Sequence, residues 1–128
     1  MANALVIGMG GVGSVIGQKL HSYACFERIV LADVDTTHAQ RLDAHTPNSR
    51  FEVAQLNATD TNGLAEFLRD RKIAVVCNAC TWQANHSVLT ACAEAGAHYL
   101  DMAADIFSPR GVQKKSCLLY TSPSPRDS

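Results

Sequence analysis

The sequence predicts an α/β fold built on a doubly wound parallel β-sheet. Two observations support this prediction. Short apolar runs alternate along the chain with segments whose apolar residues recur at helical spacing, and a glycine-rich turn joins the first run to the first such segment. This alternation is typical of β-α-β units in a parallel sheet covered by helices on both faces. Because crossovers between parallel strands are right-handed, the expected strand order is 3-2-1-4-5.

The same patterns place the individual elements. After the first apolar run, Val12, Ile16 and Leu20 recur at the i, i+4, i+8 spacing of a helix. Asp60 stands where a helix N-cap is expected, and Gly96 stands where a C-cap is expected. The expected strands are 4–7, 28–33, 51–56, 73–78 and 98–101, and the expected later helices are 36–44, 61–70 and 84–95.

The turn after the first strand has the pattern G-x-G-x-x-G, at Gly8, Gly10 and Gly13. Gly8 permits a sharp exit from the strand, Gly10 lets the backbone approach a pyrophosphate, and Gly13 lets the helix lie close to the strand. The first N–H groups of the helix would then face the anion. Strand, turn and helix are the context that this pattern requires, so we expect a Rossmann-type dinucleotide-binding turn rather than a glycine-rich turn without a ligand.

The second strand ends on Asp33, 20 residues beyond Gly13. A dinucleotide-binding fold places at this distance the acid that hydrogen-bonds the 2′-hydroxyl of the adenosine ribose. A carboxylate there would repel a 2′-phosphate, and Val34 rather than a basic residue follows it. The expected cofactor is therefore NAD, with NADP as the alternative. Asp33 or Asp35 as a helix N-cap is the structural alternative for this acid pair.

Composition excludes several other classes of protein. A formal net charge of −1 gives no electrostatic case for nucleic acid, and no apolar run approaches the roughly 20 residues that span a bilayer. The five cysteines are odd in number, and no signal sequence follows Met1, so we expect free thiols and a cytoplasmic protein. Cys77 and Cys80 form a C-x-x-C, but no second ligand pair has zinc spacing, so no metal is expected.

The C-terminal end differs in character from the rest of the chain. From Lys114 onward no amphipathic period is present, and prolines exclude regular structure. The stretch Cys117–Asp127 resembles the translation of a transposon-end adaptor used in preparing DNA sequencing libraries. We therefore expect a dinucleotide-binding domain over 1–108 and an irregular tail over 109–128, of which about 116–128 is not native sequence. A native disordered tail is the alternative.

Five stretches of the chain together match the pattern of a known family: Val6–Gly13, Ile29–Asp33, Asn57–Asp60, Asn78–Ala79 and Ala91–Asp101. Through them, residues 4–103 resemble the N-terminal cofactor domain of the saccharopine dehydrogenase family, which includes carboxynorspermidine dehydrogenases. Three positions depart from the family pattern: the family often has an acid in place of Asn57, a proline near Trp82, and a basic residue in place of Val34.

The resemblance implies a nicotinamide-dependent oxidoreductase that acts on a C–N bond. A hydride would pass between the cofactor and a secondary amine or imine of an amino-acid or polyamine substrate. The small-molecule substrate would bind a C-terminal domain that this chain lacks, so no catalytic residue is assigned, and the full-length protein is expected to be a homo-oligomer. The expected cofactor contacts are Gly8, Gly10, Gly11, Val12 and Gly13 for the pyrophosphate, Asp33 for the adenosine ribose, Asn57 and Ala58 for adenine, and Asn78, Ala79 and Cys80 for the nicotinamide ribose.

Two alternatives come from other functional classes. An ATP-dependent adenylating enzyme of the ubiquitin-activating type shares the loop Gly8–Ser14 and an acid pair after the second strand. The segments that follow in that family are absent, since this chain has Thr36–Arg41 and Thr81–Asn85 instead. A non-enzymatic NAD-sensing domain, as in regulators of potassium transport, has the same fold, so the fold alone does not distinguish it. The resemblance of His98–Asp101 and the preceding helix to the dehydrogenase family argues against it.

Overall fold

The computed structural model describes residues 2–80 and 84–101. The strands and helices alternate strictly along this part of the chain. The strands are β1 (Ala2–Ile7), β2 (Phe26–Asp33), β3 (Phe51–Gln55), β4 (Ile73–Asn78) and β5 (His98–Asp101), and the helices are α1 (Gly11–His21), α2 (Thr37–Ala44), α3 (Thr61–Asp70) and α4 (Asn85–Ala95).

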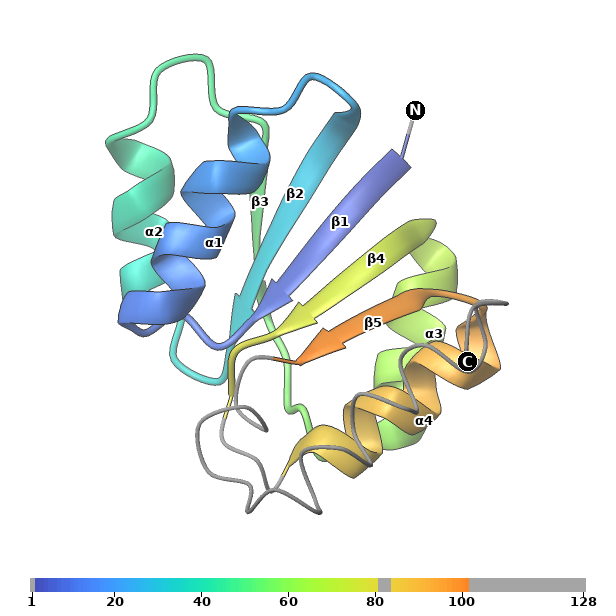
Figure 1. Cartoon of the computed structure of the whole chain (residues 1–128). Helices are drawn as coiled ribbons and strands as arrows, with labels where there is room; N and C mark the ends of the chain where they lie inside the picture. Colours follow the sequence, from blue (N-terminus) through green and yellow to red (C-terminus); the bar gives the residue numbers. More distant parts are fainter. Residues whose placement is uncertain (1, 81–83, 102–128) are drawn as a thin grey trace, which may run out of the picture.

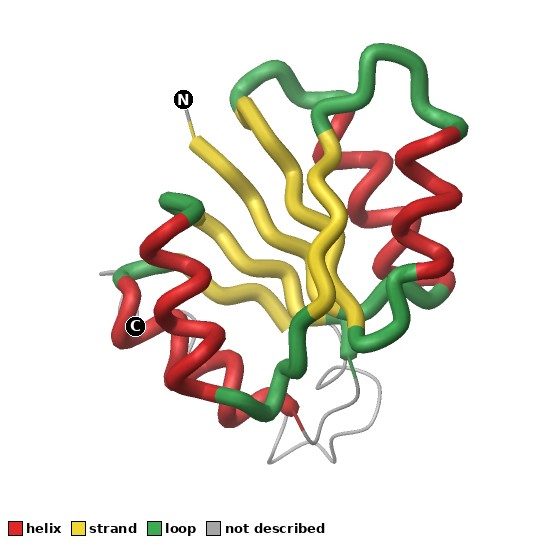
Figure 2. The backbone as a smooth tube through the Cα atoms, turned by 180° about the vertical axis from the view of Figure 1, so that it is seen from behind, coloured by secondary structure: helices red, strands yellow, loops and turns green. Residues whose placement is uncertain are grey.

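The five strands form one parallel sheet in the order β3-β2-β1-β4-β5, which confirms the expected order 3-2-1-4-5. Helices α1 and α2 cover one face of the sheet, and α3 and α4 cover the other (Figure 1). The view from behind shows the sheet between the two helix pairs (Figure 2). The strand order reverses between the neighbouring strands β1 and β4, because the helices that follow β1 and β4 lie on opposite faces of the sheet. A doubly wound sheet opens its ligand crevice at this switch point.

Two hydrophobic clusters fill the spaces between sheet and helices. Leu5 and Ile7 of β1 belong to the cluster under α3 and α4, whereas Val6 between them belongs to the cluster under α1 and α2. Successive side chains of a strand point to opposite faces, so an uninterrupted apolar run supplies both clusters. This explains why the central strands read as continuous apolar runs rather than as an alternation.

Helix α1 packs on the sheet through two glycines and through Ile16 and Leu20, which are partly buried against the cluster on that face as their spacing predicts. Its buried residues are Gly13 and Gly17, while Val12 is 51% exposed. A Cβ added at Gly17 would lie 3.0 Å from Leu31 Cδ2, so the helix approaches β2 so closely that the Leu31 side chain would have to shift to admit it. Val12 therefore lies on the outer side of the first turn.

The predicted helix ends agree with the structure. The Asp60 side chain accepts a hydrogen bond from the Gly63 N–H at 3.2 Å and so caps α3. Gly96 ends α4 in the left-handed conformation, with φ of 79°. Asp35 Oδ1 accepts from the Thr37 N–H at 3.0 Å, so this acid, rather than Asp33, binds the first turn of α2.

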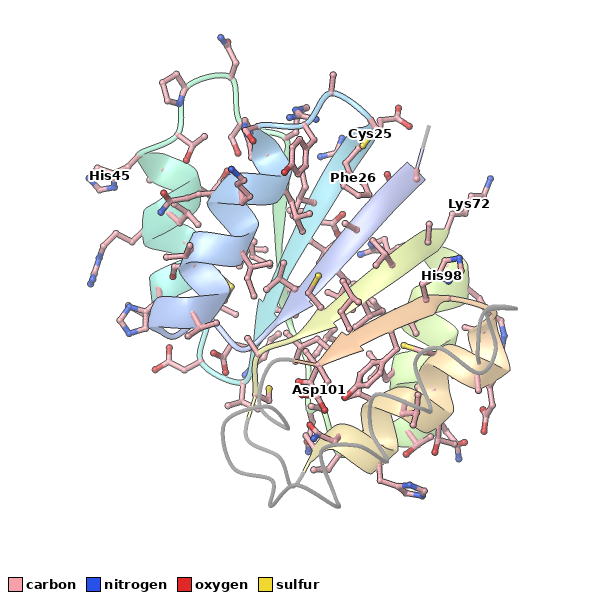
Figure 3. The ribbon with its side chains drawn as sticks, viewed as in Figure 1. Cys25, Phe26, His45, Lys72, His98 and Asp101 are labelled. Atoms are coloured by element: carbon pink, nitrogen blue, oxygen red, sulfur yellow. The ribbon has the colours of Figure 1, made fainter. Side chains whose placement is uncertain are left out.

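Different polar side chains lie at the carboxyl ends and at the amino ends of the strands. Asp101 lies at the carboxyl edge, whereas Lys72 and His98 lie at the opposite edge, at the start of β4 and β5 (Figure 3). Within residues 2–80 and 84–101, no helix is long and apolar enough to cross a membrane. The expectations for the tail, 109–128, lie outside the described residues, as does Trp82.

Candidate cofactor-binding site

A cavity of about 390 Å³ opens where the carboxyl ends of β1, β2, β3 and β4 meet. These ends lie together at the lower edge of the sheet in Figure 1. The position is the switch point of the sheet, where dinucleotides bind in folds of this class. The lining residues are Ile7, Gly8, Met9, Gly10, Asp33, Val34, Leu56, Asn57, Ala58, Thr59, Ala79, Cys80 and Ala84.

The turn after β1 depends on two glycines. Gly8 has φ of 94°, a conformation that L-residues with a side chain rarely adopt, and its N–H donates to the Ala32 carbonyl at 2.8 Å. A Cβ added at Gly13 would lie 1.7 Å from the Gly8 carbonyl oxygen, so the first turn of α1 rests directly on the strand end. The geometry of the turn therefore requires glycine at both positions.

The N-terminus of α1 has no side-chain cap and no acidic residue in its first turn. The first N–H groups of a helix have no partner within the helix and carry its positive partial charge. A Cβ added at Gly10 or Gly11 would meet no described atom within 4 Å, so the backbone is open on this side. Such an end is suited to an anion.

The Asp33 carboxylate is held by two backbone groups. Its Oδ2 accepts from the Met9 N–H at 2.7 Å, and its Oδ1 accepts from the Val34 N–H at 2.7 Å. An oxygen of a carboxylate accepts more than one hydrogen bond, so each keeps acceptor capacity on the cavity side. The carboxylate is therefore fixed beside the glycine turn and is suited to accept from ribose hydroxyls.

The wall after β4 lies across the cavity from Asp33. The Ala79 N–H donates to the Ile7 carbonyl at 2.8 Å and so continues the pairing of β4 with β1. Burial raises the pKa of the Cys80 thiol to about 11, and the Asp33 carboxylate adds to this rise. Cys80 is consequently a neutral thiol at physiological pH and is not an activated nucleophile.

The segment after β3 closes the third side of the cavity. Asn57 Oδ1 accepts from the Thr59 N–H at 2.9 Å and from the Thr59 hydroxyl at 2.6 Å, which holds the segment in a local turn. Ala58 is buried and belongs to the cluster under α3 and α4. Asn57, Ala58 and Thr59 all line the cavity, so the two residues expected beside adenine lie at its wall.

Most of the expected contact residues lie together at this edge. Gly11, Val12 and Gly13 form the first turn of α1 and do not line the cavity itself, and Asn78 also lies outside the lining. The expected contact residues that line the cavity are Gly8, Gly10, Asp33, Asn57, Ala58, Ala79 and Cys80.

Sequence reasoning missed Met9, whose side chain is buried and whose N–H binds Asp33. It also missed Ile7, Val34, Leu56, Thr59 and Ala84, which line the cavity. All of these except Ala84 are next to an expected contact in the sequence. Proximity to the strand ends could have indicated them, because a parallel sheet gathers those ends at one edge.

The described wall of the cavity carries one acidic side chain, Asp33, and no Lys, Arg or His. Its other polar side chains are Asn57, Thr59 and Cys80. Among the described residues, no group of three or more His, Cys, Asp or Glu side chains is placed to hold a metal ion. The wall thus offers hydrogen-bond acceptors for hydroxyl groups but no cation for a terminal phosphate.

Similarity to known protein sequences identifies the family of this chain. Residues 4–125 match the model of the family described as "Saccharopine dehydrogenase NADP binding domain". Carboxyaminopropylagmatine dehydrogenase of Synechocystis sp. is 30% identical over 103 residues, which cover 80% of this chain and 26% of that protein. The chain therefore spans about a quarter of the length of this curated relative.

Solved structures share the fold. Apo saccharopine dehydrogenase (L-Glu forming) of Saccharomyces cerevisiae matches 79% of this chain and 21% of its own, with a TM-score of 0.66 and 19% identity. dTDP-glucose 4,6-dehydratase of Bacillus anthracis, solved in complex with NAD, matches 98% of this chain and 52% of its own, with a TM-score of 0.72 and 14% identity. The family model indicates a nicotinamide dinucleotide as the cofactor. The chain belongs to the family of saccharopine dehydrogenase NADP-binding domains, the cofactor domains of dehydrogenases.

Proposed function

We propose that this chain is the cofactor-binding N-terminal domain of an oxidoreductase that acts on a C–N bond and prefers NAD to NADP. The observation that carries the preference is the Asp33 carboxylate, fixed at 2.7 Å from both the Met9 and the Val34 N–H groups at the cavity wall. A carboxylate fixed in this way accepts hydrogen bonds from the two ribose hydroxyls, and its negative charge repels a 2′-phosphate. No described cation lines the wall to offset that repulsion.

The other contacts follow from the geometry of the cavity. The uncapped N-terminus of α1, reached past Gly10, would bind the pyrophosphate. Asn57 and Ala58 would lie beside adenine, and Ala79 and Cys80 beside the nicotinamide ribose. When bound, NAD supplies a two-electron hydride acceptor, and the residues of this chain bind and orient it.

The substrate class rests on the family and on the curated relative. The name of that relative denotes a carboxyaminopropyl derivative of agmatine. We accordingly propose a secondary amine or imine of an amino-acid or polyamine type, bound by a domain that follows residues 1–108 in the full-length protein. An adenylating enzyme is not favoured, because the described wall has no cation to bind the phosphates of ATP.

Calorimetric titration of the 128-residue chain with NAD⁺, and separately with ATP and Mg²⁺, tests the cofactor half of this proposal. We expect saturable binding of NAD⁺ at one site. Binding of ATP with Mg²⁺ but not of NAD⁺ would overturn the proposal in favour of adenylation. The substrate half is tested with the full-length protein, by following NADH absorbance while secondary amines that carry a carboxylate are supplied. No NADH formation with any of them would contradict the C–N assignment.

A further inference from the structure

The last residue of β4, Asn78, has a fully buried side chain whose amide is hydrogen-bonded at both ends. Its Oδ1 accepts from the Cys80 N–H at 3.0 Å. Its Nδ2 donates to Asn85 Oδ1 and to the Tyr99 hydroxyl oxygen, each at 3.1 Å. Because an amide group has two N–H bonds, both donors of Asn78 are used and its orientation is fixed.

A second pair of side chains extends this network across the neighbouring strand. The Tyr99 hydroxyl donates to Asp101 Oδ2 at 3.0 Å, and both residues are buried on β5. The register of the sheet places Asp101 opposite Asn78, so the network joins the carboxyl ends of β4 and β5. The Tyr99 hydroxyl thus donates to Asp101 and accepts from Asn78, so the direction of both bonds is defined.

This network supports the cavity wall without forming part of it. Asn78 is not among the lining residues, but Cys80, which it binds directly, is. Ala84 also lines the cavity, and the residue after it, Asn85, is the second partner of Asn78. One buried amide therefore fixes the backbone at Cys80 and the start of α4 beside Ala84.

A fully buried amide calls for an explanation, because buried polar groups are tolerated when every member of their network is hydrogen-bonded. Only an amide accepts from a backbone N–H while donating twice, so aspartate and leucine would each leave partners unsatisfied. Such a network at the edge that carries the cavity points to a positioning role rather than to stability alone.

We propose that Asn78 and Tyr99 are positioning residues that set the wall formed by Ala79, Cys80 and Ala84 for the nicotinamide half of the cofactor. The inference rests on the proposed function, namely that the cavity binds NAD with its adenosine half against Asp33. It revises the expectation that Asn78 contacts the nicotinamide ribose itself. Asn78 instead acts through the backbone of its neighbours.

The test compares two ligands on the 128-residue chain, using Tyr99→Phe as the variant. This change removes the hydroxyl to which Asn78 donates and leaves the ring in the core. Tyr23→Phe makes the same chemical change at a residue 47% exposed in the loop before β2, and it serves as the matched control. The two ligands are NAD⁺, which reaches both halves of the cavity, and ADP, which reaches only the adenosine half.

Calorimetry should find NAD⁺ bound about five- to tenfold more weakly by Tyr99→Phe, the loss expected for one buried hydrogen bond. Binding of ADP should change by less than about twofold, and Tyr23→Phe should match the unaltered chain with both ligands. A purely structural role would weaken both ligands equally, so the ratio of the two affinities separates the two roles.

Unchanged affinity of Tyr99→Phe for NAD⁺, or an equal loss for NAD⁺ and ADP, would overturn the positioning role. If Tyr99→Phe fails to fold, Asn85→Ala removes another partner of Asn78 at a half-buried position and is judged by the same ratio. Failure of the unaltered chain to bind NAD⁺ would instead overturn the proposed function, so the two failures are distinguishable.

Discussion

A side chain at Gly13 would collide with the backbone at Gly8, because an added Cβ would lie 1.7 Å from the Gly8 carbonyl oxygen. The turn after β1 is therefore closed by a direct contact between strand end and helix. We expect Gly13→Ala to lower the free energy of unfolding by about 2 kcal/mol or more, since backbone atoms must shift to admit the methyl group. Urea unfolding followed by circular dichroism measures this loss, and stability equal to that of the unaltered chain would contradict the packing.

Gly10 should respond in the opposite way, because a Cβ there meets no described atom within 4 Å. We expect Gly10→Ala to change the free energy of unfolding by less than about 0.5 kcal/mol. Its affinity for NAD⁺ should fall about tenfold or more, since the methyl group stands where the pyrophosphate approaches the backbone. Calorimetry and urea unfolding of the same sample separate the two effects. Unaltered NAD⁺ affinity would show that the pyrophosphate lies elsewhere.

The cap on α3 gives a prediction that is independent of the cofactor. Asp60 accepts from the Gly63 N–H, and removing a cap of this kind costs about 1 kcal/mol. We expect this loss for Asp60→Ala. Asp70→Ala removes the same charge from the last residue of α3, where a negative charge is unfavourable, and should leave stability equal or slightly higher. Equal losses in the two variants would indicate a general charge effect instead of a cap.

The fold could be predicted from the sequence because each strand and each crossover leaves a local signature. The apolar runs, the glycine turn, Asp60 and Gly96 are all readable one element at a time. The right-handed crossover rule then orders the strands. Val12 was harder to place, because its helical spacing with Ile16 and Leu20 suggests the inner face, whereas at that turn of α1 Gly13 approaches the sheet.

The candidate site was predictable only as far as the backbone decides it. Asp33 follows from its distance to the glycine turn, and the sheet brings it to the cavity. The buried hydrogen bonds of Asn78 could not be predicted, because a polar residue at a strand end is compatible with a ligand contact and with a buried hydrogen bond. Its partners Asn85 and Tyr99 come from two later elements, and only the assembled fold places them beside it.

Three buried or partly buried thiols should lower the free energy of unfolding at alkaline pH. Burial raises the pKa of Cys77 and Cys80 to about 11 and that of Cys92 to about 12, from the ordinary thiol value of 9.0. The unfolded chain releases these protons first, so their contribution to stability is complete below pH 9.0 and is lost as the pH rises through the folded values.

We therefore expect the free energy of unfolding to fall above pH 9.0, the value at which an ordinary thiol ionises. Urea unfolding at a series of pH values measures the slope. Cys92→Ala removes one buried thiol and should make the fall less steep, whereas Cys25→Ala, at an exposed position, should not change it. The same slope in both variants would contradict the assignment to buried thiols.

We propose that the fixed Asp33 carboxylate binds the adenosine ribose and selects NAD. Calorimetric titration of the 128-residue chain and of Asp33→Asn with NAD⁺ and NADP⁺ tests it most directly. Asparagine keeps an acceptor for the Met9 or Val34 N–H but removes the charge. We expect the unaltered chain to bind NAD⁺ at least about tenfold more tightly than NADP⁺, and the variant to narrow this ratio to about threefold or less. Equal affinity of the unaltered chain for the two cofactors, or an unchanged ratio in Asp33→Asn, would contradict the account.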